Sequence, residues 1–258
     1  MDLSYNLKNL NSSTRIIQNA TTQIVTGEGG KIFPLGSGIF AEINDRFFLI
    51  SAGHLISLND YNKLMVPLPG KKEALYIDTL GNLLTTGKRG DEECPFDYAL
   101  IEITKDELVN ELLECYTPIK DDYVLFNHVP QYNDSWYLVF GYSSNKGSVD
   151  YKTLREFNAA PTRTITYPHP DQEDFIKSGY YPEHHIILKY QKKIWIHGQR
   201  IILPKTKGLS GCGVYFLPDL YNEDPDSSAY LVGILTEVDI KRQYMCAVNL
   251  PTIFTGQL

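Results

Sequence analysis

The chain has 258 residues, of which 43% are hydrophobic and 21% charged, and its formal net charge at pH 7 is −7. These proportions are typical of a globular protein with one large domain or two small ones. The acidic balance argues against a nucleic-acid partner, because phosphate groups require a basic binding face. The sequence contains no apolar run of about 18 residues, so we expect no transmembrane helix and no membrane partner.

The N-terminal segment lacks the apolar core of a secretion signal, and the four cysteines show no paired spacing. We therefore expect a cytoplasmic protein with reduced thiols. His184 and His185 are adjacent and would point to opposite faces of a strand, which disfavours a shared metal ion. The sequence predicts no metal site and no cofactor.

Residues 1–26 are predicted to form an N-terminal extension. From Gly27 onward, short apolar runs alternate with turn-forming residues, and these runs favour strands. The clearest pair is 37–43 with 46–50, because Asn44-Asp45 between them is a hairpin signal. Further strands are expected at 98–103, 123–126, 136–140, 185–190, 193–196, 213–216 and 230–235.

One segment has helical periodicity instead. The apolar residues of 105–113 lie at 108, 109, 112 and 113, which predicts an amphipathic helix. The stretch 143–183 shows few strand patterns and is expected to form surface loops. The many short strands favour an all-β barrel or sandwich. A polar linker near 118–122 would divide it into units at 27–120 and 121–258.

Residues 207–213 place Ser210 among glycines in a loop before an apolar run. A serine hydroxyl becomes a strong nucleophile when a neighbouring base removes its proton. The glycines let a substrate carbonyl approach and leave backbone N–H groups available to face it. Because such clusters are also common turns, this segment indicates catalysis only in combination with other residues.

Two upstream residues are candidates to complete such a site. His54 follows an apolar strand and two small residues, and an imidazole can accept and return a proton near neutrality. Asp97 directly precedes an apolar run, where a buried carboxylate requires a partner such as an imidazole N–H. The alternatives are a strand-end histidine bonded to backbone and an aspartate that caps a turn. The order His, Asp, Ser excludes the α/β-hydrolases, in which the nucleophile comes first.

The three segments together resemble the trypsin/chymotrypsin-like serine peptidases, including the bacterial stand-alone and HtrA-like branches. The resemblance is carried by GSGIF at 36–40, LISAGH at 49–54, DYALI at 97–101 and GLSG at 208–211, and it spans roughly 27–255. It implies an all-β fold of two six-stranded antiparallel β-barrels, with the active site in the cleft between them.

By this resemblance, His54 is the general base and acid, Asp97 orients it, and Ser210 is the nucleophile. The backbone N–H groups of Gly208 and Ser210 would form the oxyanion hole. The implied reaction is hydrolysis of a peptide bond through an acyl-enzyme, so the expected partner is a protein or peptide substrate. Narrow specificity or a regulatory protein is expected to restrain it.

The resemblance assigns the substrate pocket to Pro204, six residues before the nucleophile, and to Thr236, Glu237 and Val238 on the following strand. Pro204 lacks the charge that would favour Arg or Lys substrates. Glu237 is the candidate to select a basic side chain, and the alternative is that it faces solvent.

Two departures from the family pattern matter. Leu209 stands where zymogens of the family keep an aspartate that pairs with a freed N-terminal amine, so activation at Arg15-Ile16 or Ile24-Val25 is not expected. Cys212 lies in a GxCG context similar to that of some viral relatives. The glycine two residues before the nucleophile suits Ser210 and not Cys212, so Cys212 is predicted to be a core residue.

Two functions follow from these observations. The intact triad favours an active cytoplasmic serine endopeptidase. The alternative is a catalytically latent or inactive module of the same fold that serves as a protein-binding scaffold.

Overall fold

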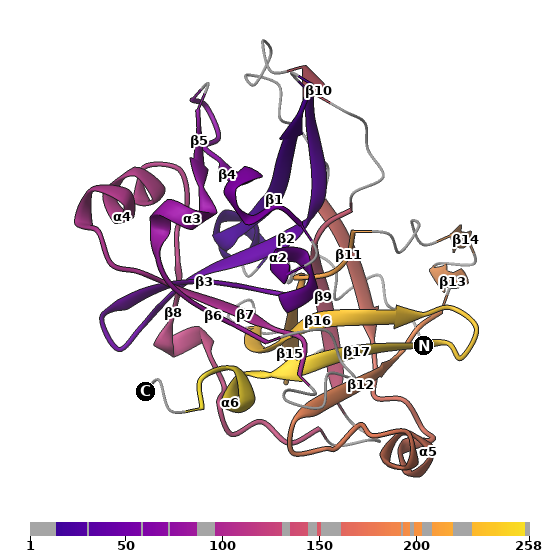
Figure 1. The fold of residues 1–258 in the computed structure, drawn as a ribbon. Helices are drawn as coiled ribbons and strands as arrows, with labels where there is room; N and C mark the ends of the chain where they lie inside the picture. Colours follow the sequence, from indigo (N-terminus) through magenta and orange to yellow (C-terminus); the bar gives the residue numbers. More distant parts are fainter. Residues whose placement is uncertain are drawn as a thin grey trace.

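Two curled antiparallel β-sheets make up most of the molecule and confirm the predicted all-β fold of two barrels (Figure 1). The computed structural model describes residues 14–29, 31–57, 59–71, 73–86, 96–130, 135–143, 149–150, 161–191, 193–196, 199–202, 208–218 and 229–255.

The first sheet has nine strands in the described residues; seven follow the order β5-β4-β1-β2-β3-β7-β6, and β8 and β10 also pair with β2. It is therefore larger than the six strands expected, because the ordered path alone has seven strands and the two-residue strands β8 and β10 extend it at β2. Its strands are β1 (Thr21–Glu28), β2 (Lys31–Ile43), β3 (Arg46–Ser51), β4 (Leu64–Pro67), β5 (Ala74–Tyr76), β6 (Gly81–Thr85), β7 (Ala99–Ile103), β8 (Ile119–Lys120) and β10 (Val149–Asp150).

Strand β1 pairs with β2 along its whole length, from Thr21 opposite Ile39 to Glu28 opposite Lys31. Most of this strand lies within residues 1–26, which the sequence predicts to be an N-terminal extension. Residues 14–20 before it are helical, and Ile17 and Ala20 are fully buried. The described part of the N-terminal segment is thus built into the first barrel and its core.

The predicted hairpin is confirmed. Strands β2 and β3 pair from Ile39 opposite Ile50 to Ile43 opposite Arg46. Asn44 and Asp45 between them have φ angles of 50° and 58°. Two consecutive positive φ values are typical of the type I′ turn, whose twist matches that of the strands it joins.

The second sheet has six strands in the order β11-β9-β15-β16-β17-β12, and a separate hairpin pairs β13 with β14. The strands are β9 (Trp136–Tyr142), β11 (Pro161–Thr166), β12 (His185–Lys189), β13 (Lys193–Ile196), β14 (Gln199–Ile202), β15 (Gly213–Leu217), β16 (Tyr230–Asp239) and β17 (Tyr244–Asn249).

Two expectations for this half of the chain are wrong. The stretch 143–183 is not only surface loop, because β11 pairs with β9 over six residues and α5 (Gln172–Lys177) follows it. Residues 123–126 form no strand beyond an isolated bridge between Val124 and Leu231. A short apolar run does not by itself tell a strand from a turn.

The predicted amphipathic helix is confirmed as α4 (Asp106–Leu113), which buries Val109 and Leu112 and leaves Leu113 41% exposed. Of the helices in the described stretches, none combines the length and the hydropathy needed to cross a membrane. The other helices are short: α2 (Gly53–Ser57), α3 (Ile77–Leu80) and α6 (Leu250–Ile253), with 3-10 turns at η1 (Tyr61–Lys63) and η2 (Asp121–Tyr123).

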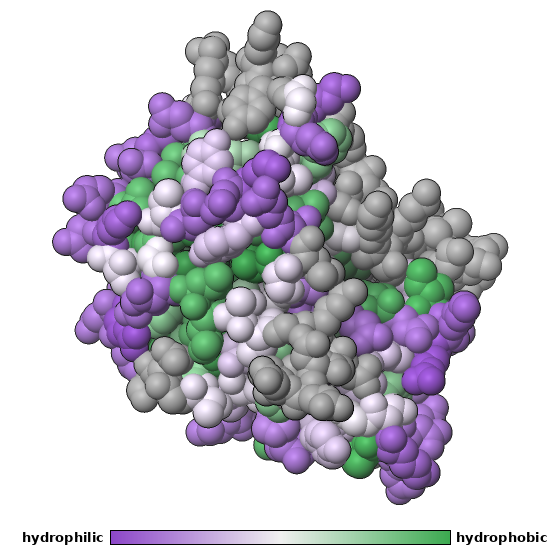
Figure 2. Space-filling model, viewed as in Figure 1, coloured by the Kyte–Doolittle hydropathy of each residue, from purple (hydrophilic) through white to green (hydrophobic). Residues whose placement is uncertain are grey.

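Each barrel has its own apolar interior, and a third cluster joins the two. This shared cluster packs Phe48 and Leu100 of the first sheet with Phe140 and Tyr215 of the second. Phe254 meets Phe48 edge to face at 5.2 Å between ring centroids, a favourable aromatic geometry. Hydrophilic side chains cover much of the face seen in Figure 2, with hydrophobic residues gathered near its middle. The two barrels are therefore joined by a shared apolar cluster.

Candidate active site

His54 lies on α2, the short turn that follows β3. The preceding residue must be glycine, because a Cβ at Gly53 would lie 2.3 Å from the carbonyl oxygen of Thr86 and 2.7 Å from that of Tyr98. This close approach brings the turn against the backbone of Thr86 and of Tyr98, the residue that follows Asp97. The small residues before His54, which marked it in the sequence, therefore serve its position next to Asp97.

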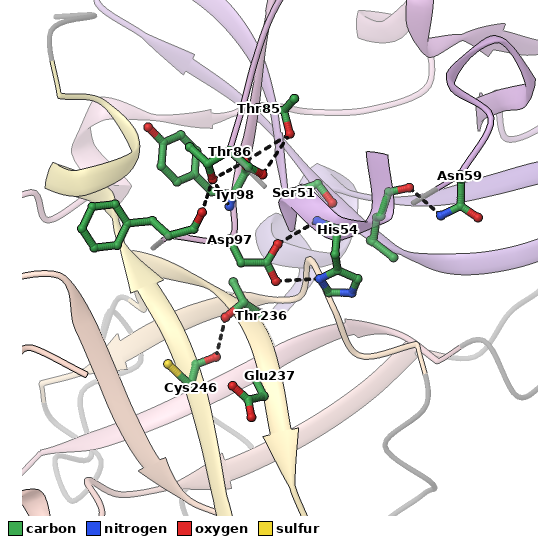
Figure 3. Close-up of polar contacts among 12 residues, drawn as sticks. Ser51, His54, Asn59, Thr85, Thr86, Asp97, Tyr98, Thr236, Glu237 and Cys246 are labelled. Atoms are coloured by element: carbon green, nitrogen blue, oxygen red, sulfur yellow. Dashed lines mark hydrogen bonds and ion pairs between the residues drawn. The ribbon is translucent and has the colours of Figure 1, made fainter. Parts of the chain in front are cut away.

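The structure brings His54 and Asp97 together (Figure 3). The Nδ1 atom of His54 lies 2.6 Å from Oδ2 of Asp97, and the backbone N–H of His54 donates to Oδ1 at 2.7 Å. The side chains are 21% and 11% exposed. An ionised carboxylate can only accept hydrogen bonds, so the Asp97 carboxylate favours the His54 tautomer that carries its proton on Nδ1. The Nε2 atom of His54 is then free to accept a proton.

Asp97 lies where the two barrels meet. The ring of Phe96 is 4.6 Å from that of His184 and 5.7 Å from that of His185, both in the second half of the chain. On the other side, Tyr98 is buried in the cluster shared by the barrels. The residues flanking Asp97 therefore anchor it to both halves of the molecule.

The loop that carries Ser210 is bound to the first barrel through its backbone. The N–H of Ser37 donates to the carbonyl oxygen of Ser210 at 3.0 Å. A Cβ at Gly36 would lie 2.6 Å from this same oxygen and 2.5 Å from Cδ1 of Leu55. Ser210 is thus placed beside the residue that follows His54.

Gly211 completes this contact. Its φ is +80°, and a Cβ there would lie 1.9 Å from the carbonyl oxygen of Ser37. That oxygen also accepts a hydrogen bond from the Ser51 hydroxyl at 2.7 Å, and Gly211 N–H donates to Leu235 of β16 at 2.8 Å. Only glycine fits both the conformation and the space.

Among the described residues, the His54 ring forms its hydrogen bond with Asp97, and the Ser210 hydroxyl donates none to it. In unliganded enzymes such bonds are often long and shorten when the substrate binds. The structure thus joins two of the three predicted triad residues directly and places the backbone of the third near Leu55, the residue after His54.

The two predicted oxyanion donors have unused N–H groups. Within the part of the chain that the structure describes, the N–H groups of Gly208 and Ser210 donate to no acceptor. Gly208 has a φ of +87°, a left-handed conformation that favours glycine. Two unpaired donors in one turn suit the binding of a developing negative charge.

Leu209 shows how this loop is anchored. Its side chain is 4% exposed and packs in the interior of the second barrel. The carbonyl oxygen of Leu209 accepts from the N–H of Cys212 at 3.1 Å. Apolar burial therefore stabilises the loop where an aspartate would need an ionic partner.

Cys212 is fully buried in the same interior. Burial raises the pKa of its thiol to about 12, so the reactive thiolate is not formed at neutral pH. Its Sγ lies 3.7 Å from the Ser37 hydroxyl. The prediction that Cys212 is a core residue agrees with this placement.

The three predicted substrate residues on β16 have different surroundings. Thr236 is buried at a bulge in the pairing with β17, lies near Asp97 in Figure 3, and donates to the carbonyl oxygen of Cys246 at 3.3 Å. Val238 packs partly against the interior of the second barrel. Bulges often re-aim side chains beside functional sites. Pro204 lies outside the described residues.

Glu237 does not simply face solvent. Its two carboxylate oxygens accept hydrogen bonds from the hydroxyls of Tyr180 at 2.8 Å and Tyr244 at 2.9 Å. Desolvation and the nearby carboxylate raise the pKa of Tyr244 to about 12 and that of Tyr180 still further, so both hydroxyls stay protonated and can donate. Neither tyrosine was predicted from the sequence, because only the pairing of β16 with β17 and the fold of the segment around 180 bring them to Glu237.

No protein-family model and no curated protein sequence matches the chain. Solved structures do match. The VesB protease of Vibrio cholerae aligns over 90% of this chain and 60% of its own, with a TM-score of 0.51 and 9% identity. The scabies mite inactivated protease paralogue S-D1 aligns over 92% and 91%, with a TM-score of 0.50 and 12% identity. The chain has a chymotrypsin-like fold.

The serine protease domain of the Sesbania mosaic virus polyprotein also aligns, over 92% of both chains, with a TM-score of 0.49 and 13% identity. Identities this low show the fold alone. One of the first two neighbours is a protease and the other an inactivated paralogue. The same fold therefore occurs in a protease and in an inactivated paralogue. Whether this chain is an enzyme has to be argued from the side chains of the site.

Proposed function

We propose that this protein is a serine endopeptidase that uses Ser210 as nucleophile, His54 as general base and acid, and Asp97 as the group that orients His54. The observation that carries the proposal is the two-point contact of Asp97 with His54, at 2.6 and 2.7 Å. The loop of Ser210 supports it, because its backbone is bound to Ser37 and lies near Leu55, the residue after His54. A histidine oriented by a buried carboxylate next to an activated serine is the arrangement of acyl-transfer enzymes.

The proposed reaction gives each of these three residues one role. Ser210 Oγ attacks the carbonyl carbon of the substrate while Nε2 of His54 takes the hydroxyl proton, and Asp97 stabilises the imidazolium through Nδ1–H. The negative charge on the former carbonyl oxygen would be stabilised by the N–H groups of Gly208 and Ser210, at about 3 to 4 kcal/mol per donor.

The tetrahedral intermediate then collapses. The C–N bond breaks as Nε2–H protonates the leaving amine, and an acyl group remains on Ser210. Water attacks this ester with His54 again as base, and the second collapse returns the proton to Ser210 and releases the carboxylic acid. Only substrate and water are consumed, and His54 and Ser210 end the cycle in their initial protonation states.

We further propose that a peptide substrate lies along residues 236–238 of β16, next to the triad, and that Glu237 selects a basic side chain. Tyr180 and Tyr244 support this, because each donates to one oxygen of Glu237 and thereby orients the carboxylate. Pro204 stays a sequence prediction for the base of the pocket, as do the cytoplasmic location and the regulatory partner.

The decisive experiment is labelling with a fluorophosphonate, which forms a covalent bond with an activated serine. The wild type should label, Ser210→Ala should not, and Cys212→Ala should label like the wild type. Labelling that persists in Ser210→Ala would show that another residue reacts. Failure of the folded wild type to label favours the alternative, a latent or inactive module that binds proteins.

The selectivity proposal has its own test. On a library of peptides, the wild type should prefer Lys or Arg at one subsite, and Glu237→Gln should lower kcat/KM for those peptides about 10-fold, the effect of losing one charged hydrogen bond. The exposed Glu183 offers a matched control, and Glu183→Gln should change nothing. An unchanged preference in Glu237→Gln would contradict the assignment.

A further inference from the structure

Thr86 carries a buried hydroxyl that none of the proposed catalytic steps uses. It follows β6 directly and is 7% exposed. Burying a hydroxyl is unfavourable unless hydrogen bonds compensate for the lost water. The partners of this hydroxyl lie on both sides of Asp97, as Figure 3 shows.

The hydroxyl bridges the two peptide units that flank Asp97. Oγ1 of Thr86 accepts from the N–H of Tyr98 at 2.9 Å, and its single proton can be donated to the carbonyl oxygen of Phe96 or, at 3.1 Å, to that of Tyr98. The backbone N–H of Thr86 donates to the carbonyl oxygen of Tyr98 at 2.9 Å. One residue therefore fixes the chain immediately before and immediately after Asp97, using the single donor and the acceptor capacity of a hydroxyl.

The same backbone is the surface on which the turn of His54 rests. A Cβ at Gly53 would lie within 3.0 Å of Thr86 O, Tyr98 O and Tyr98 N. Movement of the 96–98 backbone would therefore displace Asp97 and also the turn that presents His54. The two hydrogen bonds between His54 and Asp97 join this turn to this backbone.

We propose that Thr86 is a positioning residue for the catalytic pair: its hydroxyl sets the backbone on both sides of Asp97 and so aligns the carboxylate with His54. The inference rests on the proposed function and adds to it a residue that does not touch the substrate. Small misplacements of catalytic groups can cost about 100-fold in rate. Loss of the hydroxyl should therefore lower the rate of the chemical step and leave substrate binding intact.

The test compares Thr86→Val, which has the same shape without the hydroxyl, with Thr86→Ser, which keeps it. We expect Thr86→Val to lower kcat about 10- to 100-fold at unchanged KM, and Thr86→Ser to stay within about threefold of the wild type. Thr85→Val is the matched control. Thr85 is exposed, and its hydroxyl makes only long hydrogen bonds, to the carbonyl oxygens of Thr86 at 3.3 Å and Tyr98 at 3.5 Å. It should behave like the wild type.

A second readout does not require activity. The low-field NMR resonance of the His54 Nδ1–H proton reports the bond to Asp97, and it should shift or broaden in Thr86→Val but not in Thr86→Ser or Thr85→Val. This measurement separates the two proposals, because it tests the role of Thr86 even where the wild type neither labels nor hydrolyses peptides.

An unchanged resonance together with wild-type kcat in Thr86→Val would overturn the inference. Should Thr86→Val not fold, Thr86→Ala removes the hydroxyl with less steric demand and carries the same test. Loss of the fold in both variants would also overturn the inference, because the hydroxyl would then serve the barrel and not the catalytic pair.

Discussion

The two halves of the candidate site are stabilised by different kinds of contact. In the first barrel, His54 and Asp97 are joined through a carboxylate, and the Thr86 hydroxyl bridges the backbone around it. In the second barrel, the loop of Ser210 is bound through backbone groups, through a glycine with no room for a side chain, and through the burial of Leu209.

This difference has a consequence for mutations. A conservative change of a polar side chain in the first half should alter the chemistry and leave the fold intact. A change in the second half should alter the shape of the loop and with it the free energy of unfolding. Measuring activity and stability in parallel therefore tests whether polar side chains stabilise the first half and backbone contacts with apolar burial stabilise the second.

The largest effect on rate is expected from Asp97→Asn. A neutral amide would favour the wrong tautomer of His54, and kcat should fall about 10⁴-fold with little change in the midpoint of urea unfolding. Asp122→Asn is the control, because Asp122 is exposed, and it should keep full activity. A fall in kcat of less than about tenfold would mean that Asp97 does not orient the base.

Gly211→Ala should combine strain with a steric clash. The left-handed φ of +80° and the 1.9 Å separation from Ser37 O would force the loop away from the first barrel. Fluorophosphonate labelling should be abolished, and unfolding should require clearly less urea.

Gly29→Ala is a matched control for the strain in Gly211→Ala. Gly29 also has a positive φ, of +57°, but no atom lies within 4 Å of its Cβ position. It should cost only the backbone strain of about 1 to 2 kcal/mol and leave labelling unchanged. Equal effects of the two variants would show that the contact with Ser37 is unimportant.

Leu209→Ala should act mainly on stability. Truncation of a leucine in a packed interior typically costs about 2 to 5 kcal/mol, and Leu209 is 4% exposed. Urea unfolding should show this loss, while Leu113→Ala on α4, where the side chain is 41% exposed, should cost far less. Similar losses in both variants would mean that the burial of Leu209 does not anchor the loop.

The smallest effect is expected from Arg15→Ala. Arg15 is exposed, the backbone after it continues as a helix, and Leu209 offers no charge to a new N-terminus. The variant should therefore label and hydrolyse peptides as the wild type does. Loss of activity in the purified full-length variant would indicate activation by cleavage at Arg15-Ile16 and would contradict the prediction drawn from Leu209.

The sequence by itself determined the features that depend on local chemistry. Asn44-Asp45 predicted the turn between β2 and β3 because few residue pairs accept two positive φ angles. The spacing of apolar residues predicted α4. Asp97 could be selected because a carboxylate before an apolar strand is costly to bury without a partner, and His54 because an imidazole at the end of such a strand can accept and return a proton near neutrality.

Only the tertiary structure decided the features that depend on contacts between distant segments. Strand β1 looked like an extension because its partner β2 and the shared core are not visible in a local window. The role of Thr86 depends on a carbonyl and an N–H that lie 10 and 12 residues away in sequence. The sequence shows that Leu209 lacks the charge of the aspartate that zymogens of the resembled family keep at this position. Its burial depends on the packing of the second barrel. Such contacts arise from the closure of the barrels, and no periodicity in the chain records them.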